Sequence, residues 1–99
     1  MNFIKLDDLE IQNRQLTGLC FNWNGDIYFY GLALDFEGKK ICNRLSKFKL
    51  NSIVEVEAKS HTSSFNGVCK LYEIDIPPRE ETNKDRVIYR FSGKLARIS

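Results

Sequence analysis

The residue types that most often carry out catalysis are sparse in this chain. It has a single histidine, His61, in a polar run with Thr62, Ser63 and Ser64. A Ser-His-Asp hydrolase needs an oriented base beside its nucleophile, and no glycine pattern of a nucleophile elbow surrounds these serines. The chain also lacks the glycine-rich G-x-G-x-x-G and G-x-x-x-x-G-K-[ST] phosphate cradles. We therefore interpret His61 as a solvated loop residue and expect no enzyme activity, no cofactor and no small-molecule substrate.

Two acidic groups have the residue type for acid–base work. One contains Asp7, Asp8 and Glu10, and the other is Glu80-Glu81. Paired carboxylates catalyse reactions when a cleft holds them and separates their pKa values. Both groups fall in segments that have the composition of a terminus or a loop, so we interpret them as solvated.

The three cysteines, Cys20, Cys42 and Cys69, do not form a C-x-x-C pair, so we expect no metal site. If all lie on strands, Cys20 is opposite Phe29 and Cys42 is opposite Ala33. Those partners are four residues apart on one strand, or roughly 13 Å. A disulfide needs α-carbons within about 7 Å. We therefore expect reduced, half-buried thiols.

Basic residues gather in two segments, although the net charge is only +2. Residues 39–49 contain five basic residues and no acidic one, and residues 84–97 contain five against Asp85 alone. If the sheet brings these segments together, a basic stripe forms beside an exposed aromatic ring. The predicted binding residues are Lys40, Arg44, Arg90, Lys94 and Phe29.

Most of the chain alternates with the period of two that is typical of strands, with turn residues between the runs. The pattern predicts six strands, near residues 15–23, 26–36, 39–46, 53–60, 68–76 and 87–97. The first fourteen residues have the pattern of either a further strand or one helical turn.

Turn chemistry suggests a register for each hairpin. Two-residue turns at Asn24-Gly25 and Glu37-Gly38 and a three-residue loop at Phe65-Asn66-Gly67 fit the hairpin rules. In these registers Phe21 pairs with Tyr28 and Ala58 pairs with Ile74. The predicted core on the shared face contains Phe21, Tyr28, Tyr30, Leu32, Leu34, Val54, Val56, Ile74 and Phe91.

The length of 99 residues is enough for one domain with one core, and we assign residues 1–99 to a single β domain. Interior glycines at Gly18, Gly31 and Gly93 mark bends of the kind that curved sheets require. The predicted fold is all-β, a small antiparallel six-stranded meander that forms a barrel or half-barrel. It resembles an OB barrel in architecture, and a sandwich is the alternative.

No apolar run is long enough to span a membrane, and the N-terminus turns acidic where a signal peptide would be apolar. We therefore expect a cytoplasmic protein with no membrane partner. A second sheet face with Ile27, Phe29, Ala33 and Cys42 is either a contact patch or is covered by the N-terminal segment.

Two functions fit these features. The first is a non-enzymatic binding protein that acts through a protein–protein surface, as an inhibitor or immunity-type neutraliser, on a partner with an acidic surface. The alternative is an OB-like module that binds single-stranded nucleic acid, because such barrels hold strands in basic grooves with aromatic platforms.

Overall fold

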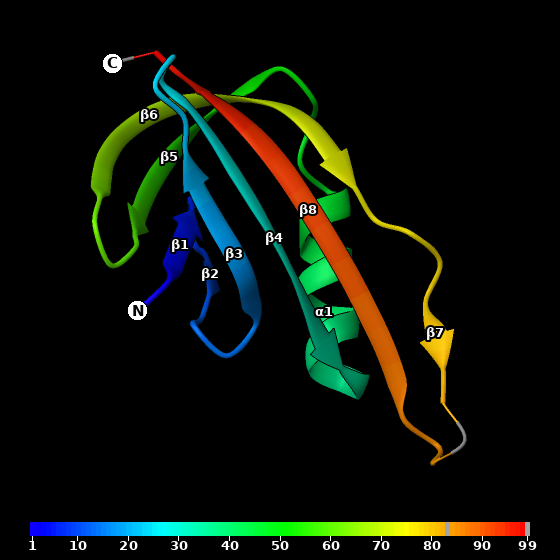
Figure 1. Ribbon diagram of the computed structural model, residues 1–99. Coiled ribbons are helices and arrows are strands. Elements are labelled where there is room, and N and C mark those ends of the chain that lie inside the picture. The colour runs from blue at the N-terminus through cyan, green and yellow to red at the C-terminus, as the bar shows by residue number, and fades with distance from the viewer. Residues whose placement is uncertain (83, 99) are drawn as a thin grey trace.

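The computed structural model describes residues 1–82 and 84–98. In this part of the chain the strands form one antiparallel sheet with the order β2-β1-β5-β6-β8-β4-β3, and β7 extends one side of β8 (Figure 1). The strands are β1 (Phe3–Leu6), β2 (Leu9–Ile11), β3 (Leu16–Phe21), β4 (Asp26–Leu34), β5 (Ser52–Lys59), β6 (Ser64–Asp75), β7 (Glu80–Glu81) and β8 (Val87–Arg97). The helix α1 (Asp35–Ser46) lies between β4 and β5 in the chain.

The prediction of a small antiparallel β domain is confirmed. The sheet is strongly curved, and its end strands β2 and β3 do not pair with each other, so it is an open half-barrel (Figure 1). In the described residues, no helix is long and apolar enough to cross a bilayer.

The prediction of a third strand over residues 39–46 is wrong, because this segment belongs to α1. The residues that this helix buries are Gly38, Ile41, Cys42 and Leu45, which recur at helical spacing on one face. Gly38 does not form a hairpin turn. A side chain there would collide with the carbonyl oxygen of Ala33 at 2.4 Å, so glycine allows the helix to approach the sheet closely.

The N-terminal segment forms two strands. Leu6 pairs with Leu9 across a tight turn at Asp7-Asp8, and Asp7 adopts a positive φ of 53°. Ile4 and Leu6 are fully buried, while Lys5 between them is exposed. The period of two therefore holds from the first strand, and the alternative of a single helical turn is excluded.

The prediction of which face of β4 is buried is also wrong. Ile27, Phe29 and Ala33 are buried on the face that α1 covers, which we call the inner face. Tyr28 and Tyr30 lie on the opposite, outer face. The outer face carries the larger apolar side chains of β4, but a helix packs more closely on a face that includes small residues.

Leu32 and Leu34, which belong to the predicted core, also lie on the outer face, and neither is buried. Other members of the predicted core are confirmed: Val54, Val56 and Phe91 are buried. Phe21 and Ile74 are partly buried against the core. The predicted alternation of β8 also holds, since Phe91, Gly93 and Leu95 are buried in turn.

Two hairpin registers differ from the prediction. Phe21 pairs with Ile27, and the Asn22 N–H donates to the Asp26 carbonyl at 2.8 Å across a loop of Trp23, Asn24 and Gly25. Gly25 has a φ of +96°, the left-handed conformation that the last position of such a loop requires. The loop is thus one residue longer than the two-residue turn we inferred.

In the second hairpin, Ala58 pairs with Phe65 rather than Ile74, and Asn66 and Gly67 lie inside β6. The actual loop contains His61, and the Ser60 hydroxyl accepts hydrogen bonds from the N–H groups of Thr62 and Ser63 at 3.4 and 3.2 Å. Serine hydroxyls often close turns in this way.

Two phenylalanines allow a direct test of whether the inner face is the buried one. Phe29 is fully buried with its ring over Gly93, whereas Phe36 on α1 is 79% exposed. Phe29→Ala should lower the free energy of unfolding by about 3–5 kcal/mol. Phe36→Ala should change it by less than about 0.5 kcal/mol. Urea denaturation of both variants measures this difference, and equal effects would contradict the assignment of the core.

Candidate functional site

The residues of the predicted basic stripe lie on two sides of the sheet. Lys40 and Arg44 are on α1, which packs against the inner face. Arg90 and Lys94 are on β8 and point from the outer face, like their neighbours Leu32 and Tyr28 on β4. Phe29 is fully buried between the two groups, so the prediction of an exposed aromatic ring at this position is not met. The stripe therefore does not form as one surface.

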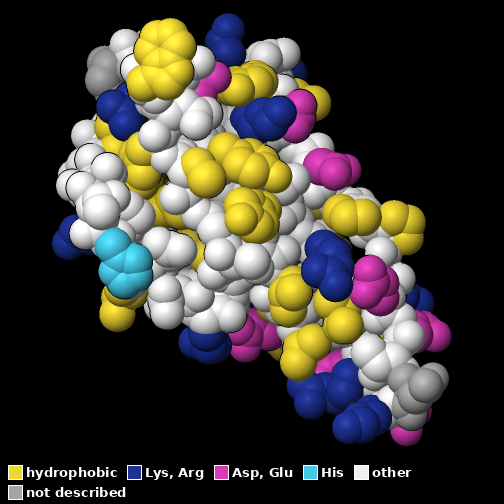
Figure 2. Space-filling view, viewed as in Figure 1, with side chains coloured by type: hydrophobic (Ala, Val, Ile, Leu, Met, Phe, Trp, Pro, Cys, Tyr) yellow, Lys and Arg dark blue, Asp and Glu magenta, His cyan; other side chains and the backbone are white. Residues whose placement is uncertain are grey.

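The outer face carries cations that are already paired with acids. Arg90 contacts Glu80 at 3.2 Å, and Lys94 contacts Glu73 at 3.4 Å. The Lys94 ammonium also lies 5.9 Å from the centre of the Tyr28 ring, which stacks on Tyr30 at 5.3 Å. Figure 2 shows hydrophobic side chains on this side of the molecule, with basic and acidic side chains interspersed beside them. This surface is aromatic but carries little uncompensated positive charge.

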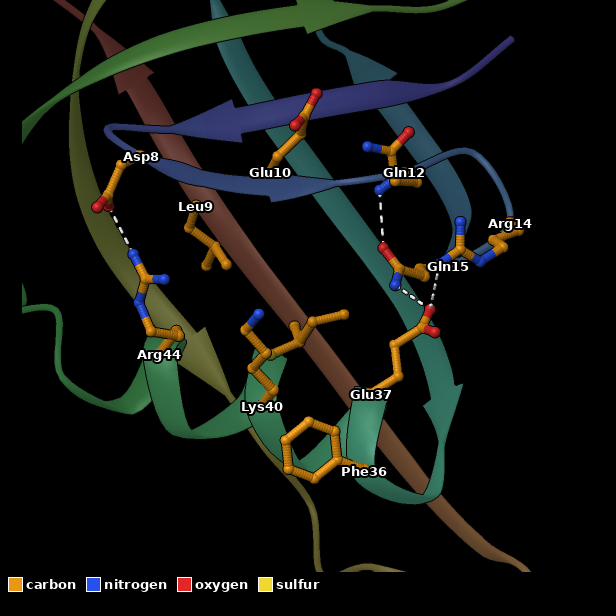
Figure 3. Close-up of a pocket in the computed structure, with 11 residues that line it drawn as sticks. Asp8, Leu9, Glu10, Gln12, Arg14, Gln15, Phe36, Glu37, Lys40 and Arg44 are labelled. Atoms are coloured by element: carbon orange, nitrogen blue, oxygen red, sulfur yellow. Dashed lines mark hydrogen bonds and ion pairs between the residues drawn. The ribbon is translucent and has the colours of Figure 1, made fainter.

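The inner side contains a cleft of about 470 Å³ between β2 and α1 (Figure 3). Leu9 and Ile41 are buried at its base, and Phe36 projects from α1 at its rim. Lys40 points from α1 toward β2, into the space between the two elements (Figure 3). An apolar base with polar groups converging on it is the usual composition of a binding cleft.

Gln15 holds one end of this cleft together. It is only 6% exposed, and its side-chain oxygen accepts the Gln12 N–H at 2.8 Å. Its side-chain nitrogen donates to Glu37 on α1, which also forms an ion pair with Arg14 at 3.0 Å. Hydrogen bonds from Gln15 and Arg14 lower the pKa of Glu37, because they stabilise its charged form. The turn before β3 is thus tied to the first turn of the helix.

The opposite end is closed by an ion pair. Arg44 donates to the carboxylate of Asp8, in the turn between β1 and β2, at 2.5 Å (Figure 3). Asp8 is well exposed, so this pair orients the Arg44 side chain more than it stabilises the fold. Lys40, between the two ends, forms no ion pair with any residue that the structure describes.

The other lysines of α1 and of the segment after it likewise form no ion pair with a described residue. In residues 1–82 and 84–98, no ion pair involves the exposed lysines of α1 and of the segment that follows it, which are Lys39, Lys40, Lys47 and Lys49. Leu50 next to them is 49% exposed. The cleft itself is lined by both signs of charge, including Glu10, which forms no ion pair in the described chain. The excess of positive charge lies along α1 and the segment after it, which also present Phe36 and Leu50.

The other residues considered for chemistry lie elsewhere. His61 is in the β5–β6 loop, where its Nδ1 is 3.1 Å from the amino group of Met1. Cys20 is exposed on β3, opposite Tyr28, while Cys42 on α1 and Cys69 on β6 are buried. Burial raises the pKa of the Cys69 thiol to about 11. Among the described residues, no group of three or more histidine, cysteine or acidic side chains has the arrangement of a metal site.

Of the residues that line the cleft, the predicted binding set contains Lys40 and Arg44 but not Phe36, Gln15 or Glu37. These three were missed because residues 15–23, 26–36 and 39–46 were interpreted as strands and Glu37-Gly38 as a turn between two of them. The signal for the helix was the apolar spacing from Gly38 to Leu45. Comparisons with protein-family models, curated proteins and solved structures found no match.

The contacts of Glu37 generate a pH-dependent prediction. Because its pKa is lowered in the folded chain, Glu37 contributes stability above its ordinary value of 4.5, and this contribution is lost as the pH falls through the folded value. Glu37→Gln should therefore lower the free energy of unfolding at pH 7 and leave it nearly unchanged at strongly acidic pH.

The urea midpoints of Glu37→Gln and of the parent protein, measured from pH 7 to strongly acidic pH, should converge as the pH falls. Glu57→Gln is the control, because Glu57 is exposed on β5 and has no ion pair within the described chain. Curves for Glu37→Gln and the parent protein that stay parallel down to acidic pH would contradict the role of these contacts.

Proposed function

We propose that this chain is a non-enzymatic protein-binding domain, and that the cleft between β2 and α1 recognises an acidic, partly apolar segment of its partner. The observation that carries this proposal is Lys40, which lines the cleft without an ion pair in the described chain, beside the exposed Phe36. Three further exposed lysines without ion pairs to described residues follow the same helix and the segment after it, Lys39, Lys47 and Lys49. A domain of this kind acts by covering the acidic surface of its partner, which is the mode of an inhibitor or a neutralising protein.

Charge and shape support a protein as the partner. Interfaces between proteins combine aromatic anchors with a polar rim. Phe36 provides an anchor that no other part of the described chain covers, and the lysines provide a rim with a single sign of charge. A carboxylate near Lys40 would not have to displace an existing acidic partner, so binding would not need to break an ion pair first.

The alternative of single-stranded nucleic acid depends on the outer face. The stacked pair of Tyr28 and Tyr30 has the geometry of a base platform. The cations beside it are paired with Glu73 and Glu80, and the carboxylate of Asp26 accepts a hydrogen bond from the Tyr72 hydroxyl next to Tyr28. A phosphate backbone would meet these acids, so the charges of this face favour a protein partner over a nucleic acid.

The experiment uses two fluorescein-labelled probes and measures their anisotropy as the protein is added. One probe is a short peptide with four glutamates around one phenylalanine, and the other is an oligothymidylate. We expect the peptide to bind, to bind more weakly as salt is added, and to be unaffected by excess oligothymidylate. Tight oligothymidylate binding with a steep salt dependence would overturn the proposal in favour of the nucleic-acid function. Binding of neither probe would also overturn it.

Charge reversal tests the location of the site. Lys40→Glu combined with Lys47→Glu should reduce the association rate for the acidic peptide by about tenfold or more, because the lysines steer an oppositely charged ligand. The matched control is Lys59→Glu combined with Lys70→Glu, which changes two exposed lysines on β5 and β6 and gives the same net charge. Stopped-flow fluorescence measures both rates. Equal losses would show that only net charge matters and that α1 is not the site.

A further inference from the structure

The edge of the sheet at β3 carries few of the features that prevent pairing with another strand: its pairing with β4 is irregular between Leu16 and Gly18, and regular from Gly18 to Phe21. β3 is an end strand, and its sequence Leu-Thr-Gly-Leu-Cys-Phe contains no charged residue and no proline. Edge strands normally carry lysines, prolines or inward-pointing charges that prevent edge-to-edge association. Among the residues that the structure describes, β4 is the only strand that pairs with β3.

The register identifies the backbone groups that remain unpaired. The Asn22 N–H bonds to the Asp26 carbonyl, so Asn22 faces β4, and so do Cys20 and Gly18 at intervals of two residues. The N–H and C=O groups of Leu19 and Phe21 therefore point away from β4, toward the edge of the sheet. No side chain in the described part of the chain bonds to these groups.

The other edge of the sheet differs in each of these respects. β2 is only three residues long, has Glu10 at its centre, and follows the acidic turn of Asp7 and Asp8. The helix α1 also lies alongside it across the cleft (Figure 3). A strand added at β3 therefore cannot propagate through β2 of the next molecule, and association at β3 closes on itself instead of forming a fibre.

We propose that β3 pairs with β3 of a second copy of this chain, antiparallel and about a two-fold axis, so that the two sheets become continuous. The uncharged edge is complementary to itself, since each copy presents the same donors and acceptors without like-charge repulsion. In an antiparallel pair, the residues that exchange hydrogen bonds lie opposite each other. Leu19 and Phe21 of one copy must therefore lie opposite residues of the other copy whose N–H and C=O groups also point to the edge. This places the two-fold axis at or next to Leu19 or Cys20.

Aromatic side chains beside the edge extend this contact. A side chain at Gly18 would overlap the Tyr30 ring at 2.4 Å, so this ring lies over β3 on the outer face. Trp23, at the end of the β3–β4 hairpin, is 99% exposed. In either register, the hairpin end of one copy lies near the start of β3 in the other. The dimer would therefore change the surroundings of Trp23, which is the single tryptophan of the chain.

The pairing is short, so the dimer is expected to be weak and reversible. Six residues of strand bury less than the ~1,200 Å² that a stable protein interface needs. The test is sedimentation velocity from low-micromolar to near-millimolar protein concentration, together with the emission spectrum of Trp23. We expect a monomer–dimer equilibrium in this range and a blue shift of the emission as the dimer forms.

Two substitutions at one position separate edge pairing from side-chain packing. Leu19→Pro removes an N–H that points to the edge and breaks no bond to β4, whereas Leu19→Ala shortens the same side chain and keeps the N–H. Leu19→Pro should weaken dimerisation at least tenfold more than Leu19→Ala does. Thermal unfolding of both variants verifies that they are folded.

If Leu19→Pro does not fold, Cys20→Lys serves in its place. It puts a charge beside the proposed axis at an exposed position, and Ile53→Lys on the centrally paired β5 is its control. Dimerisation lost in Cys20→Lys and kept in Ile53→Lys supports the proposal. A protein that stays monomeric at every concentration overturns it, as does a dimer that neither β3 variant weakens. Binding of the acidic peptide is measured separately, because it takes place at the cleft.

Discussion

The packing of α1 on the inner face is the interaction on which the rest of this structure depends. A curved sheet with one apolar face must cover that face, and here a helix of twelve residues does so from the middle of the chain. Leu45 and Ile41 are buried against the sheet, and the Cys42 thiol lies 3.7 Å from the Arg90 carbonyl oxygen. Burial of these side chains, together with the apolar side chains of the inner face, stabilises the half-barrel through the hydrophobic effect.

Close approach requires small residues where the layers meet. Gly38 lets the helix contact the sheet near Ala33 and Tyr89, and Gly93 leaves space for the ring of Phe29. Asp35, the first residue of the helix, has a φ of 53°, and its carboxylate accepts the Val87 N–H at 2.9 Å. The backbone therefore turns sharply from β4 into α1, and β8 holds the turn in place. Contacts with Val87 and Arg86 also lower the pKa of Asp35.

The same helix creates the candidate site. Its buried side completes the core, and its exposed side carries Lys40 and Phe36 next to the edge of β2. Gln15 and Glu37 hold the start of the helix, while Arg44 and Asp8 hold its end. The cleft is thus framed at both ends by polar contacts. Lys40, between these contacts, has no acidic partner in the described chain, and for this reason we propose this surface for an acidic ligand.

Much of the strand pattern could be predicted from the sequence, because period-two alternation is a local property. The bounds of β8 matched the prediction, and those of β4 and β5 differed by at most two residues. The helix was missed because Glu37-Gly38 between apolar runs resembles a hairpin turn. The face of β4 was inverted because Tyr28 and Tyr30 are larger than their inward neighbours. Which face is buried depends on where α1 packs, and that is a tertiary contact that no local pattern contains.

The most direct test of the central claim, that α1 both completes the core and presents the binding surface, is a nitrogen–proton correlation spectrum recorded during titration with the acidic peptide. We expect the shifts of backbone amides to change in two segments that are far apart in sequence, residues 8–15 and 36–50, which the cleft brings together. Amides of Tyr28, Tyr30 and Arg90 on the outer face should remain unchanged. Changes confined to that outer face, or an absence of changes near Lys40, would contradict the account.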